Sequence, residues 1–178
     1  MKIIGIGGSL RHPSCTYQVL QLALKRINSK NGNAELIDLR ELKLPFCDGS
    51  DSYTLYPDVE YFKHQVKTSN GILLASPEYH GSVSGVLKNA LDLLDEDDIR
   101  GKVVGLIAVL GGVHSTNAIN TLRIICRQLH CWVLPDQLVI PHVRESLSEQ
   151  GQFKDPSHEE RLNIMIDHFV SAVHRFSI

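Results

Sequence analysis

The chain has 178 residues, 43% of them hydrophobic, and a formal net charge of −2 at pH 7, which suits one domain that buries its own core. The charge is nearly balanced and includes no long basic run, so we expect a small molecule as partner, with no nucleic acid and no membrane surface. No apolar stretch approaches the roughly 18 residues of a membrane span, and no signal-like leader precedes the first apolar run, which together predict a cytoplasmic protein.

Five short apolar runs predict buried strands. They are residues 2–7 (KIIGIG), 34–39 (AELIDL), 71–76 (GILLAS), 103–110 (VVGLIAVL) and 138–141 (LVIP). Longer stretches with helical spacing separate them, and this alternation is typical of parallel strands joined by crossover helices. Because the runs do not alternate between apolar and polar residues, both faces of the sheet must be covered. We therefore predict an α/β protein with three layers, formed by residues 1–178 as a single domain.

Apolar residues spaced by three and four predict five helices between and after these strands. The first covers about residues 15–29, and the others are centred on residues 59–66, 86–94, 119–129 and 162–173. Residues 40–57 contain two prolines and few apolar periods, so they read as a long loop, and loops of that length are often functional. The acidic run DEDD at residues 95–98 is predicted to be a solvated turn.

The segments that follow the strands mark the predicted binding edge, because ligands of open parallel sheets bind beyond the carboxyl ends of the strands. These segments are GGSLRHPSCT (7–16), the 40–57 loop, SPEYHGSVSG (76–85) and LGGVHSTN (110–117). Three of the four are rich in glycine and hydroxyl residues, a composition that packing alone does not explain. We therefore expect a ligand site where these loops meet.

The segment GGSLRHPSCT has the composition of an anion site. It enters a predicted helix N-terminus, where unpaired N–H groups and the helix dipole favour a negative charge. Ser9, Ser14 and Thr16 can donate hydrogen bonds to a phosphate, and Arg11 can add a charge-assisted one. The alternative from this stretch alone is an ordinary Ser or Thr N-cap beside a solvated arginine.

Common nucleotide and metal motifs do not account for these loops. No GxxxxGK[ST] occurs, and the dinucleotide fingerprint fails because Leu10 stands where its third glycine is required, although Gly5, Gly7 and Asp38 would fit. The nine histidines form no HxxxH or HExxH, and the four cysteines form no CxxC pair. We therefore expect no metal site and no disulfide framework.

Two of the segments together resemble the NADPH-dependent FMN reductase family of flavodoxin-like proteins, which includes azo, quinone and chromate reductases. GGSLRHPSCT is similar to the pattern GSxRxxSxN, and SPEYHGSVSGVLKNALDLL is similar to PEYNGSxPGxLKNAxD. The chain departs from these patterns at Thr16 and His80, where the family usually has Asn, and at Ser84, where it usually has Pro. The resemblance implies a flavodoxin-like sandwich, with a five-stranded parallel sheet in the order 2-1-3-4-5 and helices on both faces.

The resemblance also implies a cofactor and its site. FMN would be bound, NADPH would be the co-substrate, and the chemistry would be carried by the flavin, with no catalytic side chain and no metal. The residues implied to bind FMN are Ser9, Arg11, Ser14, Cys15 and Thr16 near the phosphate, Pro77, Glu78, Tyr79, His80, Gly81 and Ser82 along the isoalloxazine ring, and Gly111 and Gly112 in a third loop. A homodimer or homotetramer is implied in the same way.

The expected reaction takes hydride from NADPH or NADH and reduces a flavin, quinone, azo or metal-ion acceptor in a ping-pong cycle. A flavodoxin-type electron carrier and a flavin-binding regulatory protein remain as alternatives. Flavodoxins are usually strongly acidic and lack an arginine in the first loop, so the charge of −2 and Arg11 favour the enzyme. Lys43, Arg123 and Arg144 are candidates, without ranking, for the 2′-phosphate of NADPH.

Overall fold

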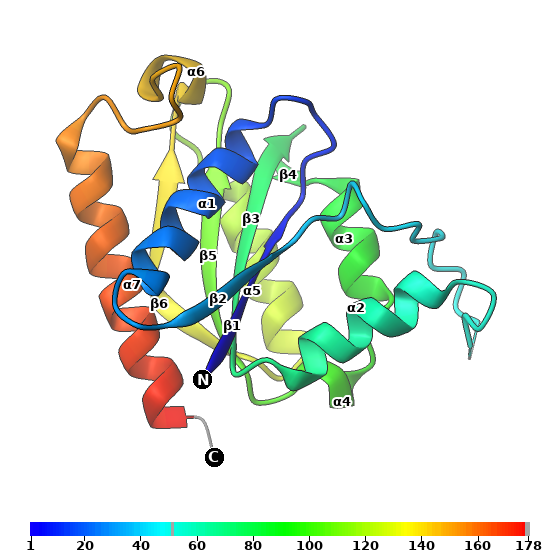
Figure 1. Cartoon of the computed structure of the whole chain (residues 1–178). Helices are drawn as coiled ribbons and strands as arrows, with labels where there is room; N and C mark the ends of the chain where they lie inside the picture. The colour runs from blue at the N-terminus through cyan, green and yellow to red at the C-terminus, as the bar shows by residue number, and fades with distance from the viewer. Residues whose placement is uncertain (51, 177–178) are drawn as a thin grey trace.

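The computed structural model describes residues 1–50 and 52–176, in which a twisted sheet lies between two layers of helices (Figure 1). The strands are β1 (Lys2–Gly7), β2 (Asn33–Ile37), β3 (Gly71–Tyr79), β4 (Ser82–Val83), β5 (Val103–Val109) and β6 (Trp132–Ile140). The five longer strands are parallel and follow the order β2-β1-β3-β5-β6, and two-residue β4 pairs antiparallel with β3. When only the parallel strands are numbered, this is the predicted order 2-1-3-4-5, which is confirmed.

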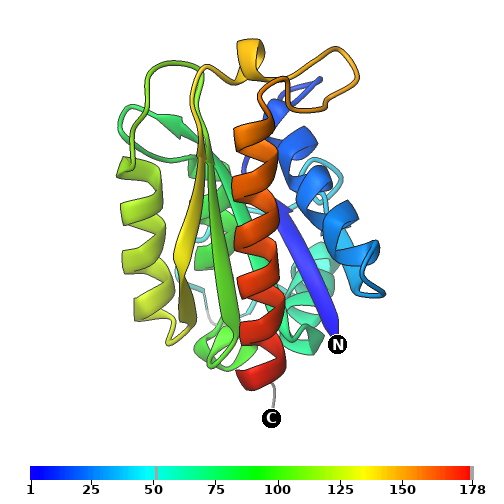
Figure 2. The ribbon, with the colours of Figure 1, turned by 90° about the vertical axis from the view of Figure 1, so that its left-hand side faces the viewer.

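Helices cover both faces of the sheet, as the unalternating strands require. They are α1 (Cys15–Asn28), α2 (Pro57–Thr68), α3 (Gly85–Asp92), α4 (Glu96–Ile99), α5 (Asn117–Gln128), α6 (Val143–Ser146) and α7 (Pro156–Phe176). Helices α1 and α7 cover one face, where Ile3 is buried, and α2, α3 and α5 cover the other, where Ile4 and Ile6 are buried (Figures 1 and 2). The five predicted helices are all present. None of the described helices is long and apolar enough to cross a bilayer.

The prediction of a solvated turn at residues 95–98 is wrong for Asp98, although Asp95, Glu96 and Asp97 are exposed. Residues 96–99 form the single-turn helix α4, and Asp98 is buried with 5% of its surface exposed. Its carboxylate accepts a hydrogen bond from the backbone N of Asp95 at 3.0 Å, and Lys63 lies 3.7 Å from the same carboxylate. The spacing of three between Asp95 and Asp98 is that of a capping box, so this acidic run starts a short helix in which Asp98 is buried while the other three acidic residues are exposed.

Strand β6 begins six residues before the predicted run at Leu138, because the earlier part of the strand contains Pro135. The pairing of β6 with β5 shifts register here, so that Val104 opposes Val133 but Leu106 opposes Gln137. A proline without an N–H is tolerated at such a bulge on an edge strand. Because Pro135 interrupts the apolar run, the sequence did not predict the first half of β6.

Tyr17 joins the ends of β1 and β2. Its buried hydroxyl donates to the carbonyl of Gly7 at 2.8 Å and accepts from the backbone N of Leu39 at 3.0 Å. The ring comes this close only because Gly7 has no side chain, since a Cβ there would lie 2.9 Å from the ring. Burial, assisted by the nearby Asp38 carboxylate, raises the pKa of Tyr17, so the hydroxyl stays protonated and can serve both partners.

Removing this hydroxyl should destabilise the fold. We expect Tyr17→Phe to lower the free energy of unfolding by about 1–3 kcal/mol, because two buried backbone groups lose their partner. Urea denaturation followed by circular dichroism measures the change, and Tyr61→Phe, at a tyrosine of α2 that is 49% exposed, is the matched control. Equal unfolding midpoints for the two variants would show that the Tyr17 hydroxyl does not hold these strand ends.

Candidate functional site

Three of the loops at the carboxyl edge of the sheet border one cleft of about 770 Å³. Its size falls in the range of about 300–1,000 Å³ that is usual for small-molecule sites. The residues that line it are Ser9, Arg11, His12, Pro13, Cys15, Thr16, Pro77, Glu78, Tyr79, Val109, Gly111, Val143 and Arg144. The segments after β1, β3 and β5 therefore meet as the parallel topology predicts.

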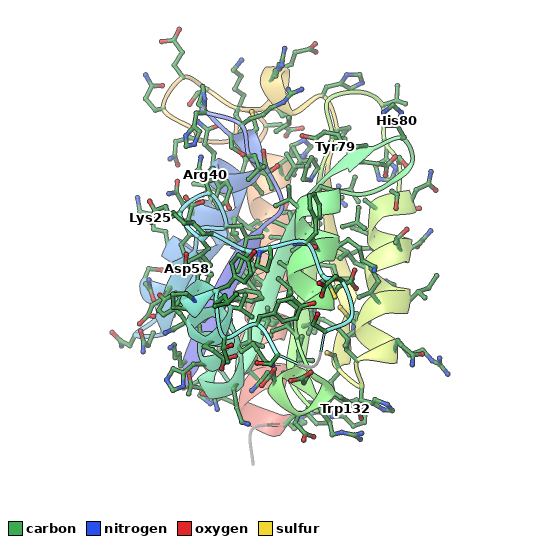
Figure 3. The ribbon with its side chains drawn as sticks, turned by 90° about the vertical axis from the view of Figure 1, so that its right-hand side faces the viewer. Lys25, Arg40, Asp58, Tyr79, His80 and Trp132 are labelled. Carbon is green, nitrogen blue, oxygen red and sulfur yellow. The ribbon has the colours of Figure 1, made fainter. Side chains whose placement is uncertain are left out.

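Most of the sequence-predicted site residues line this cleft, and the rest belong to the same loops. Those that do not line it are Ser14, His80, Gly81, Ser82 and Gly112. Tyr79 and His80 lie together at this end of the molecule, far from Trp132 at the opposite end (Figure 3). Their roles toward a ligand stay predictions, whereas their convergence on one edge is a feature of the structure.

The hydrogen bonds of the first loop are compatible with both interpretations of its sequence, the helix N-cap and the anion site. Ser14 is the N-cap of α1, with its Oγ accepting from the backbone N of Tyr17 at 3.3 Å. The Oγ of Ser9 accepts from the backbone N of Arg11 at 3.4 Å. Because both hydroxyl oxygens act as acceptors, their hydrogens remain available to an anion. Arg11 is exposed and forms no ion pair with any described residue, so its charge is also available.

Close packing holds the first loop against the start of α3. The backbone N of Gly8 donates to the carbonyl of Ala75 at 2.8 Å. A Cβ on Gly8 would lie 2.5 Å from Oγ of Ser84 and 2.7 Å from Cβ of Leu87, so only glycine fits. Ser84 is the N-cap of α3, and its backbone N donates to Oγ of Ser76 at 3.1 Å. A serine thus performs the helix-start role at the position where the family pattern has proline.

The segment after β3 is a β-hairpin that the sequence analysis missed. Tyr79 pairs with Ser82, so the loop consists of His80 and Gly81 alone, and both have positive φ, 51° and 75°. A two-residue hairpin of this kind favours Asn-Gly, because asparagine tolerates the left-handed region. The left-handed backbone at position 80 therefore explains why the family usually has asparagine there. In this chain the dipeptide His80-Gly81 was the signal from which the hairpin could have been predicted.

Glu78 links the second and third loops. Its Oε2 accepts a hydrogen bond from the backbone N of Ala118 at 3.0 Å, at the first turn of α5. The carboxylate therefore caps a helix N-terminus, a favourable place for negative charge. Glu78 lines the cleft, and its side chain also fixes the position at which the loop after β5 enters α5.

The structure places Lys43, Arg123 and Arg144, the three candidates for the 2′-phosphate of NADPH, in different surroundings. Arg144 lines the cleft, and its helix α6 is fastened to the third loop because the backbone N atoms of Val143 and His142 donate to Leu110 and Gly112, each at 2.9 Å. Arg123 instead binds Gln137 and two carbonyls of β6. Lys43 is exposed and lies outside the cleft. Arg144 follows the end of β6 by four residues, and that position was the available signal.

The described residues contain no group of three His, Cys, Asp or Glu side chains suited to a metal ion. The cleft instead offers backbone N–H groups, neutral hydroxyls, two arginines and an exposed aromatic ring. Hydroxyls and arginine at a helix N-terminus suit a phosphate, and glycines beside a tyrosine suit a flat ring. A phosphorylated aromatic cofactor therefore fits these residues.

Known proteins resemble this chain in sequence and in fold. The family model described as NADPH-dependent FMN reductase matches residues 1–145. An FMN-dependent NADPH-azoreductase of Staphylococcus aureus is 31% identical to the chain and aligns with 97% of it and 95% of the relative. The flavoenzyme NAD(P)H:(acceptor) oxidoreductase FerB of Paracoccus denitrificans has a TM-score of 0.80 at 20% identity, covering 98% of each chain. An archaeal flavodoxin, with a TM-score of 0.68 at 17% identity over 98% of this chain and 99% of its own, shares the fold.

The contact between Gly8 and α3 gives a prediction. We expect Gly8→Ala to lower the free energy of unfolding by about 1–3 kcal/mol, because the added Cβ overpacks against Ser84 and Leu87. Gly111→Ala is the control, since a Cβ there meets nothing within 4 Å. Both are measured without ligand by thermal and urea unfolding. A Gly8→Ala variant as stable as Gly111→Ala would contradict the packing described.

Proposed function

The chain belongs to the NADPH-dependent FMN reductase family, and on this basis we propose how its cleft serves the reaction. Family membership makes it an oxidoreductase that depends on FMN, with NADPH as the co-substrate. When bound, FMN accepts hydride and passes electrons on, so the chain's own residues need to bind, orient and shield it. The observation that carries the proposal is the convergence of a phosphate-type loop and two glycine-containing loops on one cleft.

We propose that the loop after β1 binds the FMN phosphate. Ser9 and Ser14 are buried, and each keeps a hydroxyl hydrogen for an anion while its oxygen accepts from the backbone. The N-terminus of α1 adds its dipole, and Arg11 adds a charge-assisted hydrogen bond. Cys15 and Thr16, in the first turn of α1, complete this end of the cleft.

The isoalloxazine ring is proposed to lie between the hairpin after β3 and the loop after β5. Tyr79 is 41% exposed at the cleft and offers a ring face. Gly111 and Gly112 have open space where a Cβ would stand, which permits close approach of a flat ring. Backbone N–H groups of residues 79–82 would donate to the ring edge, where negative charge develops on reduction.

A second cavity supports the proposal that the electron acceptors are planar organic molecules. It has a volume of about 620 Å³ and shares Tyr79 with the cleft. Its apolar wall consists of Leu10, Leu39, Leu42, Leu44, Phe46 and Val86. Such a wall suits a flat aromatic quinone or azo compound. The staphylococcal relative is named an azoreductase, which agrees with an azo compound as acceptor. We propose that hydride transfer and acceptor reduction alternate at one ring face, in a ping-pong cycle.

The exposed apolar side chains beside this cavity support assembly of the chain with its own copies. Phe46 is 88% exposed and Leu10 is 56% exposed. Large exposed apolar patches commonly mark protein interfaces. We propose a homodimer or homotetramer, and the mass of the protein in solution, measured by light scattering, tests it.

The electron carrier is the competing function, since flavodoxins share this fold. A carrier that docks on redox partners would be expected to carry a strongly acidic surface, whereas this chain has a net charge of −2 and an arginine in its first loop. These two features favour direct turnover with a dinucleotide.

Anaerobic reduction tests the proposed function. We expect the protein loaded with FMN to show a flavin absorbance band that NADPH bleaches on the time scale of turnover. Steady-state rates with a quinone acceptor should give parallel double-reciprocal lines. A bound flavin that NADPH leaves oxidised would favour the electron carrier, and intersecting lines would reject the ping-pong cycle.

The phosphate site is tested by its arginine. We expect Arg11→Ala to weaken FMN binding by about 1.5–3 kcal/mol, the worth of a charged hydrogen bond, and to leave riboflavin binding unchanged because riboflavin has no phosphate. Arg127→Ala, at an exposed arginine in the last turn of α5, is the matched control. Unchanged FMN affinity in Arg11→Ala would remove Arg11 from the site.

A further inference from the structure

Arg40 stands three residues after the end of β2 and makes several directed contacts with its neighbours. Its guanidinium forms an ion pair with Asp38, in which Nε donates to the two carboxylate oxygens at 2.8 and 3.1 Å. The same guanidinium lies over the ring of Tyr17, 4.0 Å from its centre. Only 17% of the Arg40 side chain and 13% of the Asp38 side chain are exposed. The pair is therefore held rigidly beside the tyrosine that ties β1 to β2.

The remaining edge of the guanidinium reaches the first loop. Nη1 of Arg40 donates to the carbonyl of Arg11 at 3.2 Å and lies 3.2 Å from Nδ1 of His12. Arg11 and His12 both line the cleft. Figure 3 shows Arg40 toward the same end of the molecule as Tyr79 and His80. A residue from the end of β2 thus fixes the middle of a loop that lies 29 residues earlier in the chain.

The charge of Arg40 is already used by Asp38. The hydrogen bonds from Arg40 hold the pKa of the Asp38 carboxyl below its usual range, so the pair is ionised at neutral pH. Arg40 lines the second cavity and not the cleft, and its Nη1 donates to the backbone of the loop. Its contribution to an anion site is therefore the shape of the loop, and the charge that meets the anion comes from Arg11.

We propose that Arg40 is a positioning residue that holds the loop of residues 9–14 in its phosphate-binding shape. The inference rests on the proposed function, because it assumes that this loop binds the FMN phosphate. A loop fixed before binding does not have to be ordered when the ligand arrives, which favours affinity. A planar guanidinium is needed to stack on Tyr17, pair with Asp38 and reach Arg11 at once, and a lysine ammonium cannot do all three.

The test compares FMN with riboflavin, which carries the same ring without the phosphate. We expect Arg40→Met and Arg40→Lys to raise the dissociation constant of FMN roughly tenfold, the equivalent of one lost hydrogen bond. The dissociation constant of riboflavin should stay as in the wild type. Quenching of flavin fluorescence measures both. Arg100→Met is the matched control, because Arg100 forms an exposed ion pair with Glu96 away from the cleft.

Equal losses for FMN and riboflavin would overturn the proposal, since they would show general damage to the site. Unchanged FMN affinity would overturn it as well. Hydrogen exchange of the FMN-free protein gives a second readout, in which Arg40→Lys should speed exchange of the backbone amides of residues 9–12 and leave β5 protected; unchanged exchange in residues 9–12 would also count against it. If the wild type binds FMN no more tightly than riboflavin, the phosphate assignment of the proposed function is itself wrong, and this inference is rejected with it.

Discussion

The site depends on the position of β1 inside a parallel sheet, with β2 on one side and β3 on the other. Parallel pairing places the carboxyl ends of all three strands at one edge, so the loop after β1 has neighbours from both sides. The Tyr17 hydroxyl fixes it against β2, and Gly8 packs it against the start of α3. The geometry that could receive a phosphate is therefore set by strand order before any ligand is present.

Several polar residues in the cleft or in the elements that border it make structural contacts that hold the site in place. Ser14 caps α1 through its oxygen and keeps its hydrogen for an anion. Glu78 lines the cleft while capping α5, and Ser84 caps α3 where it meets the first loop. Because each such group is already hydrogen-bonded, it is held in place without the ligand. Arg40 likewise donates a hydrogen bond to the backbone carbonyl of Arg11, the contact on which its proposed positioning role rests.

The five parallel strands and the five longer helices were predictable, because unbroken apolar runs and repeated spacings of three and four leave strong signals. The strand order was an expectation from the resemblance to flavodoxin-like reductases, since apolar runs do not say which strands are neighbours. The short elements α4 and α6 were missed, since a single turn has no periodicity, and the hairpin at His80–Gly81 was missed because its signal is only two residues long. The loops of the site were found from composition. The contact of Arg40 was not, because it joins residues 29 positions apart in sequence, and spacing carries no information about such contacts. Arg144 was a candidate that the sequence left unranked, although its place four residues after β6 was an available signal.

A crystal structure of the protein with FMN bound tests the central claim most directly. The account predicts the phosphate within hydrogen-bonding distance of Ser9, Arg11 and Ser14 at the N-terminus of α1. The ring should lie between the hairpin of residues 79–82 and the glycines at 111 and 112. An FMN bound elsewhere, or bound in this cleft with its phosphate turned away from the first loop, would contradict the account.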